Sequence, residues 1–449
     1  MKKIFALLMV FTTLITMPVS AEKDGEKTRS SELAPNSETA VVIDMTSDYI
    51  LFEKDMNKKM FPASLTKLMT AILTVENKAM EDTTVVSESA VADINKYESS
   101  NVDLDPGDVL TVDELMHALL IPSANDAANV LAEFVGGSRE EFVKMMNEKA
   151  KELGCKNTNF VNANGLHDDN HYTTAYDMAL IAKAAMEKPE IAEIVGLWSF
   201  VMSDSGYTYA STNHLVSRYV YLDYYYVNAT GIKTGYTDEA QRTLASSASD
   251  GEHQIIAVVM GCPDNEDGTF TSFVDAKQLL SHFLENNSNK VYISANQIIG
   301  EKKAKNAKGD GRLLMITPVT KEAFLPSDTT DADITYNIKL KTEEIVAPIK
   351  KNQLLGHADV LYKGSKISTI ELRSDREIKK SYIEAFFNAI GGFTLLKIII
   401  GILIVIVIAL IIIRQRNLYL RKKRRAEKLR ELRLREEAER NDFRNRNNF

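Results

Sequence analysis

Cysteine is scarce in this chain, because Cys155 and Cys262 are the only two among 449 residues. Two thiols allow at most one disulfide, so a fold held together by a disulfide framework is excluded. A single bridge and two partly buried free thiols both stay open at this point. The sequence also lacks an internal repeat and a glycine-rich phosphate loop, which excludes repeat architectures and phosphate cradles of that type.

Long apolar runs are confined to two places. Residues 4–15 follow Lys2 and Lys3 and lead into the small-residue motif Val-Ser-Ala at 19–21, so residues 1–21 predict a secretory signal peptide. Residues 398–413 contain no charge, and together with the preceding apolar residues they approach the length that crosses a bilayer. We therefore predict a transmembrane helix over residues 391–413.

Charge is distributed unevenly along the chain. The formal net charge is −8, but residues 414–449 hold 14 lysines and arginines against six acids and are net +8. The positive-inside rule places this tail in the cytoplasm and the larger part of the chain outside the membrane. Its position beside a membrane span favours topology and lipid contact over nucleic acid, and no nucleic-acid partner is expected.

The order of predicted elements indicates two folded domains between these ends. Residues 22–37 are polar and predict a tether, and residues 38–288 run from strands through helices back to strands. That order favours an α+β fold in which an antiparallel sheet pairs early strands with late ones under a cover of helices. Residues 289–375 predict a small all-β domain, and residues 376–390 a juxtamembrane segment with an amphipathic helix.

Periodicity, capping residues and turn residues set the expected element positions. In the first domain, strands are expected at 39–43, 49–53, 231–233, 244–248 and 254–260, and helices at 64–75, 111–120, 126–134, 139–153, 174–186 and 275–284. In the second domain, strands are expected at 291–293, 313–317, 334–340, 358–362 and 367–372.

Ser64 and Lys67 are the first candidates for chemistry. They are three residues apart at the start of an apolar helical run, so the hydroxyl and the amine share one helix face. Such a pair supplies a nucleophile with its own base. Lys67 can act as a base only when it is neutral, which requires burial and a second cation nearby, and Lys233 is the available cation. The alternative to a catalytic pair is that Ser64 and Lys67 are surface residues of an amphipathic helix without a catalytic role.

Ser123 and Asn125 form a second candidate group. The triplet Ser-x-Asn occurs at Ser99, Ser123, Ser211 and Ser294, so the triplet alone discriminates little. Ser123 is distinctive because it lies in a loop broken by Pro122 between two predicted helices. There the hydroxyl can pass on a proton while Asn125 holds a substrate amide. The alternative is that Ser123 merely caps the next helix.

Lys233-Thr234-Gly235 occurs once and reads as part of an edge strand. Gly235 permits the close approach of a ligand backbone, and a peptide can add to the edge with its carboxylate at Lys233 and Thr234. The alternative is an ordinary strand end with a glycine turn. A purely structural explanation is possible for each motif alone. It is much less plausible for three motifs in this order in an exported chain.

His167 and His171 would share a face and could bind a metal such as zinc if this segment were helical. The neighbouring Gly165 and Asn170 and the aspartate pair at 168–169 favour a loop, so no metal is expected.

From about residue 38 to residue 374 the chain resembles the low-molecular-mass penicillin-binding proteins, specifically the serine-type D-alanyl-D-alanine carboxypeptidases. The likeness lies in Pro-Ala-Ser-Leu-Thr-Lys at 62–67, Ser-Asn-Val-Asp-Leu at 100–104, Leu-Ile-Pro-Ser-Ala-Asn-Asp at 120–126, Asn-Gly-Leu at 164–166 and Ile-Lys-Thr-Gly-Tyr-Thr-Asp at 232–238. It implies a β-lactamase/DD-peptidase-like catalytic domain, a small β domain and no cofactor. Many relatives end in an amphipathic helix on the membrane, whereas this chain is expected to continue through it.

The resemblance also implies site roles. Ser64 would attack the penultimate D-alanine of a peptidoglycan stem peptide with Lys67 as base, and Ser123 would protonate the leaving amine. The backbone N–H groups of Ser64 and Tyr236 would form the oxyanion hole. Lys233, Thr234 and more loosely Thr237 would hold the terminal carboxylate, and β-lactams would acylate the same serine.

Three alternatives remain beside this interpretation. A serine β-lactamase shares the motifs, but the added β domain and anchor argue against it. A DD-endopeptidase would use the same site, and a catalytically silent wall-binding protein is disfavoured by the complete set of nucleophile, base and carboxylate clamp.

Overall fold

The computed structural model describes residues 32–47, 49–203, 206–389, 391 and 393–446. The predicted signal peptide and residues 22–31 of the predicted tether lie outside the described residues. The chain falls into two compact units, the first built mainly from residues 32–293 and the second from later residues. Each is described by itself.

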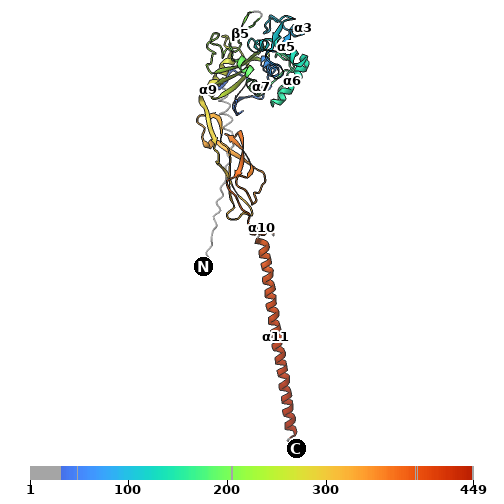
Figure 1. The fold of residues 1–449 in the computed structure, drawn as a ribbon. Coiled ribbons are helices and arrows are strands. Elements are labelled where there is room, and N and C mark those ends of the chain that lie inside the picture. The colour runs from blue at the N-terminus through green and yellow to red at the C-terminus, as the bar shows by residue number, and fades with distance from the viewer. Residues whose placement is uncertain (1–31, 48, 204–205, 390, 392, 447–449) are drawn as a thin grey trace. The chain divides into compact units, whose positions relative to one another are not determined.

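The first unit is centred on a five-stranded antiparallel sheet (Figure 1). In spatial order its strands are β2 (Ile50–Lys54), β1 (Thr39–Asp44), β9 (Gln254–Cys262), β8 (Gln241–Ser249) and β7 (Ala229–Thr237). The early strand β1 pairs with the late strand β9, and β7 lies at an edge, as the sequence predicts.

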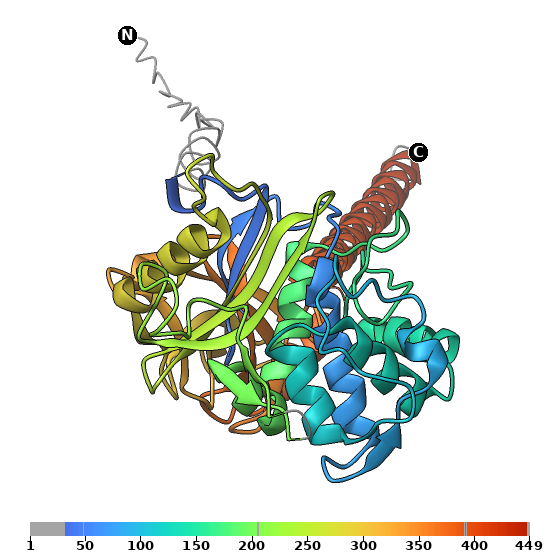
Figure 2. The same ribbon diagram turned by 90° about the horizontal axis from the view of Figure 1, so that it is seen from above.

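Helices cover both faces of this sheet (Figure 2). The helix α9 (Thr271–Asn286) packs on one face, where Phe273 and Leu280 join a buried apolar cluster. The other face carries α7 (Ala175–Met186) and, further out, a helical layer with its own larger core. The remaining helices of this layer are α2 (Lys67–Asn77), α3 (Glu88–Val91), α4 (Val112–Leu120), α5 (Asn125–Gly136), α6 (Arg139–Glu152) and α8 (Pro189–Val195).

Capping explains where several helices begin. Thr111 and Glu114 form the predicted capping box of α4, and the Thr174 side chain accepts from the Asp177 N–H at the start of α7. Two small two-stranded sheets were not predicted: β3 (Thr83–Val85) with β4 (Val109–Thr111), and β5 (Ser199–Val201) with β6 (Thr208–Ala210). Three-residue strands are too short to show a periodic pattern.

The end of the predicted tether is part of the fold. Ala34 and Ser37 are buried, and Asp275 of α9 accepts hydrogen bonds from Asn36 and Ser37. The polar composition of residues 32–37 therefore serves side-chain pairing with a distant buried carboxylate, which sequence-local patterns do not reveal.

The later strands form two sheets. One pairs β10 (Asn287–Ile293) with β13 (Lys321–Pro326), and the other has the order β11 (Ile298–Lys303), β12 (Arg312–Ile316), β16 (Ser365–Ser374), β15 (Leu354–Tyr362) and β14 (Ile334–Leu340). The five predicted strands are present, whereas β11 and β13 were missed. Their charged residues, alanine and proline give little strand propensity, so pairing with neighbours decides their conformation.

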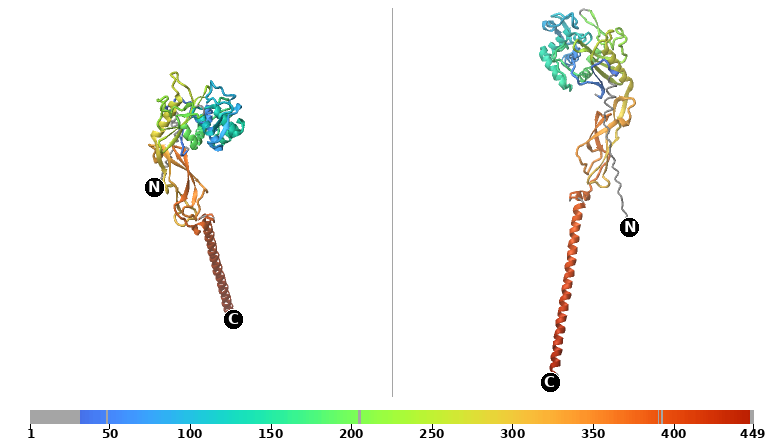
Figure 3. Two further views of the ribbon diagram at one scale, coloured as in Figure 1. Left: turned by 45° about the horizontal axis from the view of Figure 1, so that its top comes forward. Right: turned by 180° about the vertical axis from the view of Figure 1, so that it is seen from behind.

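Two helices follow the β domain. The predicted juxtamembrane helix is α10 (Tyr382–Ala389). The helix α11 (Phe393–Arg446) continues without interruption through the predicted span and the basic tail (Figure 3). It is long and apolar enough to cross a membrane by length and composition.

Candidate active site

Ser64 lies in a 3-10 turn, η1 (Ala63–Thr66), whereas the sequence predicts that the regular helix begins there. The helix α2 starts at Lys67, and Ala63, the first residue of the turn, has a left-handed backbone with a φ of 49°. Residues three apart eclipse in a 3-10 turn. Ser64 Oγ and Lys67 Nζ are accordingly 2.9 Å apart, so the predicted pair is brought together.

Lys67 is completely buried and faces only neutral partners at hydrogen-bond distance. Besides Ser64 Oγ, these are Asn125 Oδ1 and the Asn164 carbonyl oxygen, each 2.6 Å from Nζ. A neutral amine has two N–H donors and one lone pair, which match two carbonyl acceptors and one hydroxyl donor. The geometry therefore suits a neutral Lys67 that accepts the hydroxyl proton of Ser64.

The electrostatic surroundings act in the same direction. Burial lowers the pKa of Lys67 well below its ordinary value, the charge of Lys233 lowers it further, and the Asp126 carboxylate opposes both. Lys233 is 1% exposed, and burial lowers its pKa to about 7. Two buried ammonium groups repel each other and cannot both persist at low cost, and the hydroxyl and two carbonyl partners of Lys67 suit the neutral form of this lysine.

Lys233 and Thr234 lie on the edge strand β7, as predicted. The Lys233 ammonium donates to the Thr234 carbonyl oxygen at 3.0 Å. The Thr234 hydroxyl donates to Thr212 Oγ1 at 2.6 Å, and the Thr212 N–H donates to the Ile121 carbonyl oxygen at 3.2 Å. Thr212 thus joins the edge strand to the loop that carries Ser123. Thr212 is the middle residue of the Ser-x-Asn triplet at Ser211, for which the sequence predicted no role.

Ser123 and Asn125 occupy the loop before α5. Ser123 is 4% exposed and has a φ of 70°, which is costly for a residue other than glycine and is typical of functional sites. The capping alternative is wrong, because Ala124 is the N-cap of α5 and no side chain caps the helix. Asn125 accepts from Lys67 and donates its backbone N–H to the Ser100 carbonyl oxygen.

Two glycines are required because they pack against the turn η1, which carries Ser64 and is called the nucleophile turn below. A Cβ on Gly235 would lie 2.4 Å from Thr243 Oγ1 and 2.9 Å from the Ser64 nitrogen. The Cβ side of Gly235 is therefore filled by the protein itself, which requires a glycine here. The approach of a ligand backbone at the strand edge stays a prediction. A Cβ on Gly165 would lie 2.0 Å from the Ala63 carbonyl oxygen. The loop at 162–166 accordingly packs on this turn. Its residue Asn164, whose carbonyl oxygen contacts Lys67, was not predicted to have a role from the sequence.

Tyr236 and Thr237 complete the strand. The Tyr236 side chain is half exposed, and its hydroxyl donates to Asp238 at 2.9 Å. Thr237 Oγ1 accepts from the Ala240 N–H at 3.1 Å, which leaves its own hydroxyl proton for another acceptor.

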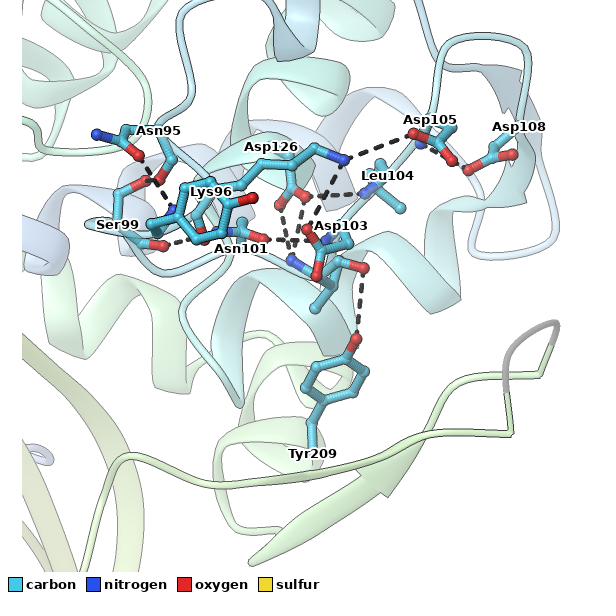
Figure 4. A network of polar contacts seen from close by, with 12 residues as sticks. Asn95, Lys96, Ser99, Asn101, Asp103, Leu104, Asp105, Asp108, Asp126 and Tyr209 are labelled. Carbon is cyan, nitrogen blue, oxygen red and sulfur yellow. Dashed lines mark hydrogen bonds and ion pairs between the residues drawn. The ribbon is translucent and has the colours of Figure 1, made fainter.

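Asp126 holds the segment at residues 102–104 next to the loop that carries Ser123 (Figure 4). This 2% exposed carboxylate accepts from the backbone N–H groups of Val102 and Leu104 at 3.1 and 3.2 Å. From the other side, the Tyr209 hydroxyl donates to the Val102 carbonyl oxygen at 3.3 Å. Burial raises the pKa of Asp126 despite these bonds. The motif at 100–104 is therefore fixed to the helix that carries Asn125.

The two histidines do not share a metal site. His171 is buried, accepts from the Val161 N–H at Nδ1 and contacts Thr66 Oγ1 through Nε2 at 2.7 Å. That pattern puts the proton on Nε2, and the Thr66 hydroxyl then donates to the Ala63 carbonyl oxygen. His171 therefore braces the nucleophile turn. Within the described ranges, no group of three potential metal ligands is present.

Both cysteines are free thiols, so the bridge left open by the sequence does not form. Burial raises the pKa of Cys155 and of Cys262 to about 12, which makes both unreactive at neutral pH.

Comparison with known proteins gives a consistent family. Residues 26–264 match the family model described as D-alanyl-D-alanine carboxypeptidase, and residues 288–380 match the C-terminal domain of penicillin-binding protein 5. The chain is 33% identical over 409 residues to D-alanyl-D-alanine carboxypeptidase DacF of Bacillus subtilis, covering 88% of this chain and 100% of that protein.

Two further relatives agree. D-alanyl-D-alanine carboxypeptidase DacA of Escherichia coli is 30% identical over 346 residues, covering 74% of this chain and 81% of that protein. The crystal structure of penicillin-binding protein 5 from Haemophilus influenzae is similar with a TM-score of 0.60 and 27% identity, covering 77% of this chain and 98% of that one. The chain therefore belongs to the D-alanyl-D-alanine carboxypeptidase family of low-molecular-mass penicillin-binding proteins, a family of serine peptidases.

Proposed function

We propose that this protein removes the terminal D-alanine from peptidoglycan stem pentapeptides through an acyl-serine intermediate, and that β-lactams acylate the same serine. The observation that carries the proposal is the 2.9 Å contact between Ser64 Oγ and a buried Lys67 whose pKa is lowered. A nucleophile beside a neutral amine needs neither a histidine nor a metal.

Acylation begins when Ser64 Oγ attacks the carbonyl carbon of the penultimate D-alanine and Lys67 Nζ takes the hydroxyl proton. The negative charge that develops on the carbonyl oxygen is stabilised by the backbone N–H groups of Ser64 and Tyr236. The close packing of Gly235 on the Ser64 nitrogen supports this assignment, because it brings the two backbone segments together.

Breakdown of the tetrahedral intermediate requires a proton on the leaving amine. Ser123 passes the proton from Lys67 to the nitrogen of the departing D-alanine, the C–N bond breaks, and the acyl-serine remains. Water then attacks the ester with Lys67 again as base, which releases the shortened peptide and restores the Ser64 hydroxyl. Asn125 positions Lys67 and the substrate amide during both steps.

The terminal carboxylate binds at the edge strand. Lys233 supplies a compact charge, and the Thr237 hydroxyl has a proton to offer. The Thr234 hydroxyl exchanges its bond to Thr212 for one to the carboxylate. A substrate carboxylate beside Lys233 also favours the charged form of this lysine, so binding and the neutral state of Lys67 support each other.

D-Alanine release tests the reaction. The full chain in detergent should release D-alanine from a diacyl-L-Lys-D-Ala-D-Ala peptide, and Ser64→Ala should abolish release while a metal chelator changes nothing. Cleavage of cross-linked dimers in preference to the linear peptide would indicate the endopeptidase instead. No turnover of either substrate would favour the silent wall-binding protein.

Penicillin tests the intermediate. Incubation with excess penicillin should add the mass of one intact β-lactam to the peptide that contains Ser64. An adduct on Ser99 or Ser123, or no adduct on the folded protein, would overturn the assignment of the nucleophile.

We further propose that the catalytic domain is extracytoplasmic and that the tail after Arg414 is cytoplasmic. The net +8 tail beside an apolar helix supports this topology. Protease added outside intact spheroplasts should digest the catalytic domain and spare a tail epitope, and detection of that epitope on untreated cells would contradict it.

A further inference from the structure

One end of the second unit carries a concentration of basic side chains. Residues 302–312 and 376–380 together hold eight lysines and arginines against two acids, net +6. The rest of residues 4–413 holds 30 basic and 54 acidic side chains, net −24. The net charge of these two segments is positive, whereas that of the rest of residues 4–413 is negative. The overall composition of the chain therefore does not account for this basic cluster.

The two basic segments are bonded to one another and to the helix that precedes the predicted span. The Lys308 N–H donates to the Lys379 carbonyl oxygen at 2.8 Å, and the Ser381 N–H donates to the Asn306 carbonyl oxygen at 2.7 Å. The Asn388 side chain of α10 donates to Asn306 Oδ1, also at 2.7 Å. The basic loop at 304–311 therefore lies against α10, a few residues from the start of α11.

A cavity of about 240 Å³ opens between the two segments. Four of its lining residues are cationic and two are acidic: Lys308, Arg312, Arg376, Lys379, Asp310 and Glu377. The arginines are held in place by ion pairs, Arg312 with Glu301 at 2.8 Å and Arg376 with Asp375 at 2.6 Å. Within the part of the chain that the structure describes, no ion pair engages the two lysines. The cavity thus presents uncommitted ammonium groups beside fixed guanidinium groups, a donor set that suits a phosphate.

Apolar side chains project from α10 beside these charges. Tyr382, Ile383 and Phe386 are 80%, 72% and 62% exposed, and their spacing places them on one side of the helix. Exposed aromatic and aliphatic side chains next to cations are typical of segments that lie in the interfacial region of a bilayer.

We infer that this basic surface, Lys303, Lys308, Arg312, Arg376 and Lys379, binds the headgroups of anionic phospholipids, with a phosphodiester in the cavity. A soluble phosphate has the same chemistry, but a lipid also satisfies the apolar side of α10. The chain itself further favours the lipid, because α11 keeps the surface at high effective concentration beside the bilayer. The β domain is thereby a lipid-binding module, beyond the anchoring that the apolar helix provides.

Hydrogen exchange of the full chain in nanodiscs tests this inference. Discs of phosphatidylcholine alone are compared with discs in which one quarter of the lipid is phosphatidylglycerol. Peptides that cover residues 302–312 should exchange several-fold more slowly in the anionic discs, and high salt should remove the difference. Nanodiscs expose both leaflets, so the result does not depend on the proposed topology or on catalysis.

Two matched variants identify the residues. The variant K303Q/K308Q/K379Q should lose the protection, whereas K321Q/K363Q/K366Q, which removes the same charge elsewhere, should keep it. Thermal unfolding checks that both variants fold. Equal exchange in both lipid compositions, or protection that survives in the first variant, would overturn the inference. Protection by inorganic phosphate in phosphatidylcholine discs without any effect of phosphatidylglycerol would overturn the lipid assignment and leave a free-phosphate site.

Discussion

Lysine occurs in opposite environments in the two units of this molecule. Lys67 and Lys233 in the candidate active site are 0% and 1% exposed, and no carboxylate forms an ion pair with either in the described ranges. Lys308 and Lys379 of the basic surface are exposed and equally unpaired. Burial disfavours the charge and produces a base, whereas exposure preserves the charge and produces an electrostatic attractant. The same side chain thus acquires two functions from solvent access alone.

Lys67→Ala should have the largest effect, because it removes the base without altering any exposed charge. Penicillin acylation and D-alanine release should fall by about 10²–10⁴-fold, the usual contribution of a positioned general base. Stopped-flow acylation and D-alanine assays measure this. Lys151→Ala, an exposed lysine of α6, is the control, and an equal loss in that variant would contradict the special role of burial.

Gly235→Ala should disrupt the cleft by packing alone. The added methyl would lie 2.9 Å from the Ser64 nitrogen, so the nucleophile turn must shift. Overpacking of this kind costs ~1–3 kcal/mol of unfolding free energy, and activity should be lost with it. Gly196→Ala is the matched control, because its added methyl would have no neighbour closer than 3.5 Å. Wild-type acylation by Gly235→Ala would show that the turn is not fixed by this contact.

Lys233 should control both limbs of the pH profile of kcat/KM. Loss of its charge removes a charge-assisted bond to the substrate carboxylate and should lower kcat/KM by about 10–10²-fold. Since the Lys233 charge lowers the pKa of Lys67, Lys233→Ala should move the acidic limb to higher pH. Lys233→Arg keeps that limb in place, and the basic limb should disappear because guanidinium does not titrate. An acidic limb that is the same in all three proteins would separate Lys233 from Lys67.

His171 should make the catalytic domain sensitive to acid. Burial lowers its pKa from 6.5 to about 4, so the neutral form is favoured in the folded state. Between pH 6.5 and 4 the unfolded chain binds a proton that the folded chain does not, so stability falls as the pH falls. The expected loss across this window is about 3 kcal/mol. Denaturant unfolding of His171→Gln should show a flatter pH dependence, whereas the exposed His357→Gln should follow the wild type.

The exposed lysines should give the smallest effect on folding. The variant K303Q/K308Q/K379Q should change the unfolding free energy by less than about 0.5 kcal/mol, because exposed side chains without partners contribute little. Urea unfolding measures this. A loss of several kcal/mol would show that the basic surface is a structural element and would weaken the contrast with Lys67.

Sequence patterns predicted most of the fold that positions the site. The capping residues of α4 and α7, the pairing of β1 with β9 and the edge position of β7 all follow from local propensity and element order. The strands β11 and β13 were not predicted because their charged residues, alanine and proline have weak strand preference. Their conformation depends on neighbours that are distant in sequence.

By itself, the sequence determined which residues are proposed to carry the chemistry, since Ser64, Lys67 and Lys233 occur in short motifs whose residue types suggest a mechanism. Only the tertiary structure decided the rest. It placed the Asn164 carbonyl oxygen on Lys67, Thr212 on Thr234, Gly235 against the Ser64 turn and His171 beneath it. These contacts join segments that local propensity cannot relate, and burial, which sets the protonation of Lys67, exists only once those segments have packed.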